Sequence, residues 1–165
     1  MIYFVDEQFI KVNTQLSKNI DWSDIAPNIR VAAITYPRNQ LGKVFFDDLL
    51  SKFNAGTLSS IEDELVELVK YITAFRAADL TVPFLSFSIK NKGIQSQSGN
   101  FSASEGLEVL NYMRNEIKKF AHIKEKELKE FLKENEKDFP LYTSEDNKKI
   151  VKPEAPESGT GFDII

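Results

Sequence analysis

Two pairs of glutamates carry a spacing that metal-assisted chemistry uses. Glu64 and Glu67 lie three residues apart, and so do Glu105 and Glu108. Residues at i and i+3 share one face of a helix, so two such pairs facing each other across a bundle would offer carboxylates to Mg²⁺ or Mn²⁺. However, Glu64 falls in an acid-rich first helical turn, Glu105 has a helix-capping role, and no third acidic motif completes a cage. The sequence therefore favours solvated helix faces over a metal site.

The single histidine is the other residue with potential for catalysis. His122 lies between Ala121 and Ile123 in a helical pattern. A catalytic base needs a nucleophile and an orienting acid, and the sequence marks neither. The chain also has no cysteine and no glycine-rich phosphate loop, which excludes a thiol nucleophile and a P-loop. We expect a protein that is not an enzyme, with no catalytic residue, no cofactor and no metal.

One short basic segment stands apart from the otherwise balanced charge. Lys90, Asn91 and Lys92 lie within residues 80–104, which contain no acidic residue. They are candidates for an interface or for contact with DNA phosphates, and a solvated hairpin tip is the alternative. The whole chain has 21 basic and 25 acidic residues and a net charge of −4. A strongly basic nucleic-acid binder is therefore not expected.

Length and composition bound the class of protein. The chain has 165 residues, of which 42% are apolar, so one domain can bury about two-thirds of its unfolded surface without a metal or disulfide. No apolar run approaches the ~18–20 residues of a membrane span. Acids follow the apolar start Met1–Val5, which is not the pattern of a signal peptide. These features predict a soluble, intracellular protein.

Apolar residues recur every three or four positions in four segments, which predicts four helices. The segments run over about 24–36, 43–53, 59–75 and 102–135. Pro37 should stop or kink the first helix, and Ser102-x-x-Glu105 is a capping box that starts the last. Residues 85–90 alternate between apolar and polar, which predicts a strand. The fold class is therefore all-α: a four-helix bundle with a small β-hairpin or extended arm within residues 82–100. The first 20 residues are ambiguous: residues 2–5 fit a short strand and residues 7–16 a short helix.

The last segment differs in composition from the rest. Residues 143–165 are polar, contain two prolines and two glycines, and show no helical period. They end on Phe162-Asp163-Ile164-Ile165, so that three large apolar residues close a tail that cannot fold alone. We divide the chain into a helical domain, 1–142, and an extended tail, 143–165, that orders on assembly. Phe162, Ile164 and Ile165 are the candidate docking residues, and a frayed terminus is the alternative.

The order of several motifs resembles the head–tail connector (adaptor or neck-ring) proteins of tailed phages, in particular those of crAss-like and other Bacteroidetes-infecting phages. The resemblance covers residues 7–142. The motifs are Asp24-Ile-Ala-Pro-Asn-Ile-Arg-Val-Ala-Ala, Pro37-x₃-Leu41-Gly42, Phe45-Phe-Asp-Asp-Leu-Leu50, Lys90-Asn-Lys-Gly-Ile94 and Phe131-Leu-x₆-Phe139-Pro-Leu-Tyr142.

This resemblance implies a connector-type bundle without catalytic residues. It implies a dodecameric ring in the neck of the virion, assembled in the host cytoplasm, that lies under the portal and extends the DNA channel. The expected partners are the portal protein, adjacent ring, neck or tail proteins, other copies of the chain, and packaged DNA that passes without sequence-specific binding. No membrane partner is expected.

The sequence is also compatible with two alternative functions. One is a metal-dependent all-α nucleotide hydrolase that uses the four glutamates named above. The other is a helical, host-directed regulatory protein that binds a single protein partner. Turnover of nucleotides with Mg²⁺ would distinguish the first from a connector, and absence from purified virions would distinguish the second.

Overall fold

The computed structural model describes residues 3–14, 16, 21–90, 93–96, 103–144 and 147, with side chains described outside 85–90, 93–96 and 103–107. The all-α prediction is confirmed, since the described residues are mostly helical. The elements in chain order are α1 (Glu7–Asn13), α2 (Trp22–Thr35), α3 (Pro37–Leu41), α4 (Lys43–Ala55), α5 (Ser60–Ser86), β1 (Phe87–Lys90), β2 (Gly93–Ser96), α6 (Ala103–Glu134) and the 3₁₀ turn η1 (Glu136–Asp138). Within the described part of the chain, no helix is long and apolar enough to cross a membrane.

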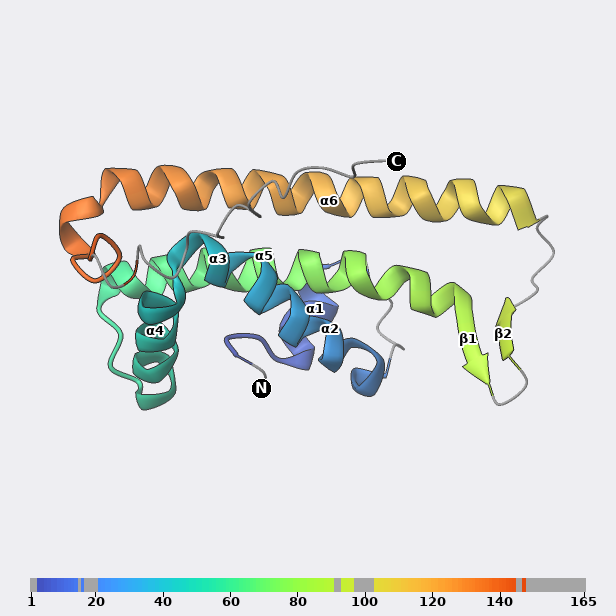
Figure 1. The fold of residues 1–165 in the computed structure, drawn as a ribbon, viewed down its shortest axis with the longest axis horizontal. Helices are drawn as coiled ribbons and strands as arrows, with labels where there is room; N and C mark the ends of the chain where they lie inside the picture. The colour runs from blue at the N-terminus through green and yellow to red at the C-terminus, as the bar shows by residue number, and fades with distance from the viewer. Residues whose placement is uncertain are drawn as a thin grey trace, which may run out of the picture.

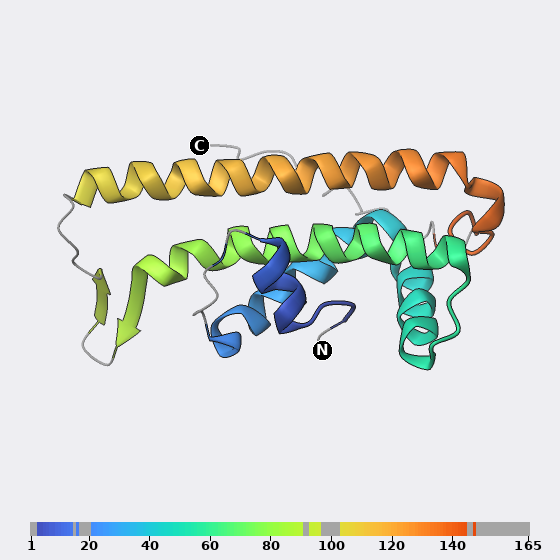
Figure 2. The same ribbon diagram turned by 180° about the vertical axis from the view of Figure 1, so that it is seen from behind.

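The helices form three layers with α5 in the middle. Figures 1 and 2 show α6 running antiparallel along one side of α5, with α1, α2 and α4 against the other side. The strands β1 and β2 lie beyond the end of α5, where they pair antiparallel with Phe87 opposite Ser96. At ~1.5 Å per residue, the 32 residues of α6 extend about 48 Å.

Two apolar clusters hold the layers together, one towards each end of α5. Aromatic residues dominate the cluster between α4, the start of α5 and the end of α6, which includes Phe4, Phe45, Phe46, Leu65, Val69, Ile72, Leu128, Leu132 and Phe139. The second cluster is built around small residues, which let α2 approach α5 closely; it includes Ile25, Ile29, Ala32, Ala74, Ala77, Ala78, Ile117 and Ala121. Each large side chain buried in this way stabilises the fold by about 1.5–3 kcal/mol.

The junction between α3 and α4 is closed by an asparagine from far along the chain. Gly42 has a φ of 83°, and a Cβ at this position would lie 2.3 Å from the side chain of Asn147. Asn147 is buried; its Nδ2 donates to the carbonyl of Leu41 at 2.7 Å, and its Oδ1 accepts from the amide of Phe45 at 3.2 Å. Glycine is therefore required at position 42 both by the backbone conformation and by the close approach.

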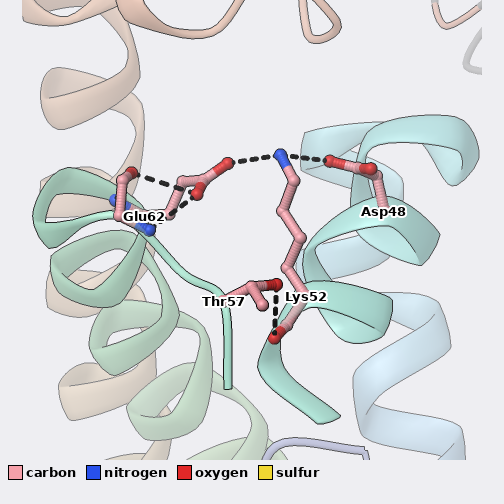
Figure 3. A network of polar contacts seen from close by, with 5 residues as sticks. Asp48, Lys52, Thr57 and Glu62 are labelled. Carbon is pink, nitrogen blue, oxygen red and sulfur yellow. Dashed lines mark hydrogen bonds and ion pairs between the residues drawn. The ribbon is translucent and has the colours of Figure 1, made fainter. Parts of the chain in front are cut away.

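A capping box and an ion-pair network connect α4 to α5 (Figure 3). The amide of Ser59 donates to Glu62 at 2.9 Å, and the amide of Glu62 donates back to the Ser59 hydroxyl at 3.4 Å. Lys52, in the last turn of α4, contacts both Asp48 at 2.8 Å and Glu62 at 2.7 Å. Gly56, with a φ of 67°, ends α4 as the left-handed cap. The helix predicted over about 43–53 is confirmed and ends two residues later, at Ala55.

The helix boundaries differ from the prediction in two places. Pro37 does stop α2, but it then occupies the first position of a further short helix, α3, because its fixed φ suits a helix start. Helix α5 continues to Ser86 and includes Pro83, so the strand predicted over 85–90 is wrong at its first two residues. The side chains of Thr81 and Val82 are buried, which shows that tertiary packing extends α5 past the apolar period that ends at Phe75.

The number of helices also differs from the four predicted. The described residues form six α-helices, because α1 and α3 are added to the predicted set. Both are short, with seven and five residues; from the sequence, α1 is a candidate only, and α3 repeats too few apolar positions to be recognised from the pattern. Asp6 caps α1 by accepting from the amide of Phe9 at 2.7 Å. The short helix expected over residues 7–16 is present as α1, whereas the described part of the segment expected as a strand, residues 3–5, forms no strand.

Candidate functional site

The most extensive polar contact in the layers is a buried ion pair between α5 and α6. Arg76 donates through Nε and Nη2 to the two carboxylate oxygens of Glu125, at 2.7 and 2.9 Å. The guanidinium lies over the ring of Tyr36, 4.2 Å from its centroid. Burial acts to lower the pKa of Arg76, but the hydrogen bonds and charge of Glu125 outweigh it and raise the pKa. Arg76 therefore stays charged, and its two hydrogen bonds to Glu125 fix the position of α6 along α5.

A second ion pair lies further along the same interface between α5 and α6, which we call the α5–α6 seam. Asp79 is almost fully buried, and Arg114 Nε donates to its Oδ1 at 2.9 Å. Lys118 Nζ lies 4.0 Å from the same oxygen. Because these cations already neutralise the buried carboxylates, the seam is a structural element between the two long helices and offers no open catalytic group.

The two glutamate pairs do not come together. Glu64 and Glu67 lie near the start of α5, whereas Glu105 and Glu108 lie near the start of α6. The two helices are antiparallel (Figure 1), so their starts are at opposite ends of the molecule. Across the described residues, no group of three or more His, Asp or Glu side chains could hold a metal ion. The four-carboxylate cage that the spacing would allow is not assembled within one chain.

His122 lies on the open side of α6 beside the buried seam. Its side chain is 83% exposed, and its Nδ1 lies 3.2 Å from Oε2 of Glu125. This carboxylate is already bound to Arg76, and no serine or threonine hydroxyl is recorded as bonded to His122 among the described contacts. Its position is that of a surface residue next to an ion pair.

The basic segment and the tail residues are described only in part. Lys90 is the last residue of β1 and pairs with Gly93 of β2. Asn91 and Lys92 lie outside the described residues, and so do the tail residues Phe162, Ile164 and Ile165. Their proposed roles in an interface, in contact with DNA or in docking therefore stay predictions.

The structure instead shows a partly exposed apolar stripe on α6, next to the side of the helix that packs on α5. We define the α6 stripe as five residues, each between 42% and 66% exposed: Val109, Tyr112, Met113, Phe120 and Ile123. At 100° per residue, these five positions fall within a sector of about 100° around the helix. The buried contacts with α5 lie on another side and include Ile117, Ala121 and Leu128. The apolar surface of α6 is therefore wider than its contact with α5. Within the stripe, Phe120 stacks on Phe75 of α5 with 5.7 Å between the ring centroids, while the stripe as a whole stays 42–66% exposed.

The apolar period over residues 102–135 does not separate this stripe from the core side. Met113 and Phe120 fall in one apolar series with Ile117 and Leu128, whereas the structure leaves them 42% and 43% exposed. The signal was present in the sequence as an excess of apolar residues over one stripe, because Val109, Tyr112 and Ile123 do not fit the core period. Scattered exposed apolar residues are ordinary, but a row of them on one helix side marks an interaction surface.

Two further apolar residues are exposed in the opposite layer. Val31 and Ile34 of α2 are 51% and 40% exposed. Helix α2 packs on α5 through Ile25, Ile29 and Ala32, so Val31 and Ile34 lie on its outer side. The molecule thus presents unpartnered apolar side chains on both of its outer layers.

The chain belongs to a protein family of unknown function, DUF6712, whose model matches residues 38–151. The matched segment contains α4, α5, both strands, α6 and Asn147, and therefore the α5–α6 seam and the whole α6 stripe. Comparisons with curated proteins and with solved structures find no match for the chain. The family carries no assigned activity, so the resemblance to phage connectors stays a prediction.

Proposed function

We propose that this protein is a structural virion protein. Its copies form a ring, dodecameric by the connector resemblance, between the portal and the tail of a phage particle. The ring extends the DNA channel and docks the next neck or tail protein. The observation that supports this proposal best is the α6 stripe, an apolar surface that the fold of one chain leaves partly exposed.

The placement of the exposed apolar residues favours a ring over a closed dimer. The α6 stripe belongs to α6, while Val31 and Ile34 belong to α2, and these two helices lie on different sides of α5 (Figures 1 and 2). A contact between two different surfaces of neighbouring copies is head-to-tail, and a head-to-tail contact that closes generates a ring. In this arrangement the α6 stripe of one copy packs on the outer side of α2 of the next.

The finer architecture is part of the same proposal. Helices α2, α4, α5 and α6 correspond to the four helices of a connector-type bundle, and β1 and β2 form the arm that projects from it. The strands lie beyond the end of α5 and next to the start of α6 in Figure 1, and in the proposed ring they are the arm that reaches a neighbouring subunit or ring.

The test is co-sedimentation of the full chain with the portal of the same virus, followed by electron microscopy. We expect the unmodified protein to be monomeric or weakly associated alone and to form rings on the portal. Replacing Tyr112 and Ile123 by serine should abolish ring formation and leave the melting temperature nearly unchanged, because these side chains are 66% and 53% exposed in the single chain. Val12→Ser, which removes a 68% exposed apolar side chain from α1, is the matched control and should assemble normally.

Several outcomes would contradict the proposal. A stable isolated dimer without affinity for the portal would exclude the ring. Nucleotide turnover with Mg²⁺ would favour the hydrolase, and absence of the protein from purified virions would favour the host-directed regulator.

A further inference from the structure

Helix α6 carries a line of basic side chains on a side different from the α6 stripe and from the side that packs on α5. They lie at i, i+3, i+7, i+10 and i+14, so they share one side of the helix along its C-terminal half. We define the α6 basic line by these exposed residues: Lys119, His122, Lys126, Lys129 and Lys133. No acidic residue lies on the line itself. This arrangement is local, since the chain as a whole has a net charge of −4.

The positive charge of the line is only weakly neutralised by neighbouring acids. Lys126 Nζ lies 3.7 Å from Glu130, with 78% and 61% of the two side chains exposed, and Lys119 pairs with Glu116 at its edge. Exposed pairs of this kind contribute about 0–1 kcal/mol and exchange readily for another anion. Within the described residues, no acid pairs with Lys129 or Lys133. The line can therefore offer several cations to one anionic partner.

The surface at the centre of the line is slightly hollowed. Lys119, His122, Lys126 and Lys129 line this hollow together with Ile123 and the buried Glu125. The carboxylate of Glu125 is held by Arg76, which removes the one negative charge that would oppose an anion here. The same contact between Arg76 and Glu125 holds α6, and with it the basic line, in position on α5.

The length and straightness of the line fit duplex DNA. Fourteen residues of helix place its ends ~21 Å apart, which is about six phosphates of one strand at ~3.4 Å each. Duplex DNA is already stiff, so it loses little conformational entropy when it binds to a rigid line of cations. A flexible acidic peptide would lose conformational entropy on binding to the same line. From this match we propose that the α6 basic line contacts the phosphates of duplex DNA, independent of base sequence, and faces the channel of the ring. The channel placement rests on the proposed function; the DNA contact does not.

The absence of native cysteine allows a direct test of which surface meets DNA. Lys129→Cys carries a photo-crosslinker on the basic line, and Lys43→Cys carries it at a 53% exposed position of α4, in the opposite layer. The two proteins are irradiated with fluorescent duplex DNA at about 50 mM salt, where phosphate contacts are strong. We expect the Lys129→Cys protein to crosslink at least about tenfold more efficiently than the control, both as free chain and in the portal-bound ring.

Salt-dependent affinity supplies an independent measurement. Four lysines that each neutralise one phosphate give a slope of log K against log salt of about −3.6. The variant Lys126→Gln/Lys129→Gln should reduce this slope by about 2 and weaken binding at least about tenfold at low salt. The matched variant Lys11→Gln/Lys43→Gln makes the same change in net charge on α1 and α4 and should leave the slope unchanged.

The outcomes separate this inference from the proposed function. Equal crosslinking at positions 43 and 129, or equal slopes for the two double variants, would overturn the DNA contact even if rings form. Competition by polyglutamate as effective as that by duplex of equal charge would assign the line to an acidic peptide and also overturn it. Crosslinking that depends on position 129 in a protein that forms no ring would support the DNA contact and contradict the ring.

Discussion

Lys52 acts at the scale of a single residue by binding two carboxylates where α4 turns into α5. Its hydrogen bonds to Asp48 and Glu62 raise the pKa of its ammonium group. At Glu62, burial acts to raise the pKa, but the hydrogen bonds from Lys52 and from Ser59 outweigh it, so the pKa lies below 4.5. Both shifts mean that the charged forms stabilise the folded chain.

The sign of the two shifts predicts how this contribution depends on pH. Because the pKa of Glu62 is lowered, its stabilisation is complete above pH ~4.5 and is lost as the pH falls through the folded-state pKa. Because the pKa of Lys52 is raised, the stabilisation from its charged form persists until the pH rises past about 10.5. We expect Glu62→Gln to lower the free energy of unfolding at pH 7 by up to about 1 kcal/mol.

Urea unfolding at pH 7 and at pH 3 measures this effect. The difference between the Glu62→Gln variant and the unmodified chain should shrink at pH 3, where the glutamate becomes protonated. Glu64→Gln, an exposed position of the same helical turn, serves as the control and should show no such change. A Glu62→Gln effect of equal size at both pH values would contradict the assignment.

At the scale of elements, the α5–α6 pair is held in register by polar as well as apolar contacts. Arg76 and Glu125 have only 12% and 9% of their side chains exposed, and their contact uses two hydrogen bonds. Aliphatic contacts alone would tolerate sliding of one long helix along the other. A buried ion pair does not, because any shift leaves an uncompensated charge.

Removing one partner should therefore be costly. We expect Arg76→Ala to lower the free energy of unfolding by about 3–5 kcal/mol, since Glu125 stays buried without its partner. The double variant Arg76→Met/Glu125→Met should recover most of this loss, because neither charge remains. Chemical denaturation of the two variants and the unmodified chain gives the comparison. If the double variant is as unstable as the single one, the cost arises from packing rather than from charge.

At the scale of the whole molecule, we expect assembly to depend on the apolar and basic surfaces that stay exposed in the folded chain. The α6 stripe and the outer side of α2 are apolar and partly exposed, and the α6 basic line lies beside the stripe on the same helix. In the proposed ring, α6 would meet a neighbouring subunit with one side and DNA with another. This division explains why a single helix of 32 residues carries three chemically different sides.

The tail adds a prediction at this scale that rests on the sequence. Ordering a backbone costs about 1–2 kcal/mol per residue, and the three anchors Phe162, Ile164 and Ile165 can each contribute ~1.5–3 kcal/mol if buried on a partner. Deleting residues 162–165 should leave the melting temperature nearly unchanged and weaken incorporation into rings on the portal. Calorimetry and co-sedimentation measure the two effects.

Replacing Glu154 and Glu157 by serine is the matched control, because it changes the tail without removing an anchor. It should assemble like the unmodified chain. If the truncated protein also assembles normally, the tail is a frayed end and not a docking segment.

Local signals in the sequence were sufficient for most of the secondary structure. The stop before Pro37, the glycine cap at Gly56 and the span of α6 depend on neighbouring residues alone, and each was predictable from proline geometry, glycine conformation or apolar period. The all-α class follows from the same patterns. The short helix α3 repeats too few apolar positions for this kind of inference.

Only the tertiary structure determines which apolar residues are buried and which charged residues form ion pairs within the chain. Met113 and Ile117 look equivalent in sequence, yet one is exposed and the other is buried, because only one side of α6 can face α5. Asn147 meets Gly42 across more than a hundred residues, and Arg76 meets Glu125 only once the helices are antiparallel. Local pattern determines where helices form, but the surfaces that remain for function are those left over after packing, and packing depends on contacts between residues far apart in the chain.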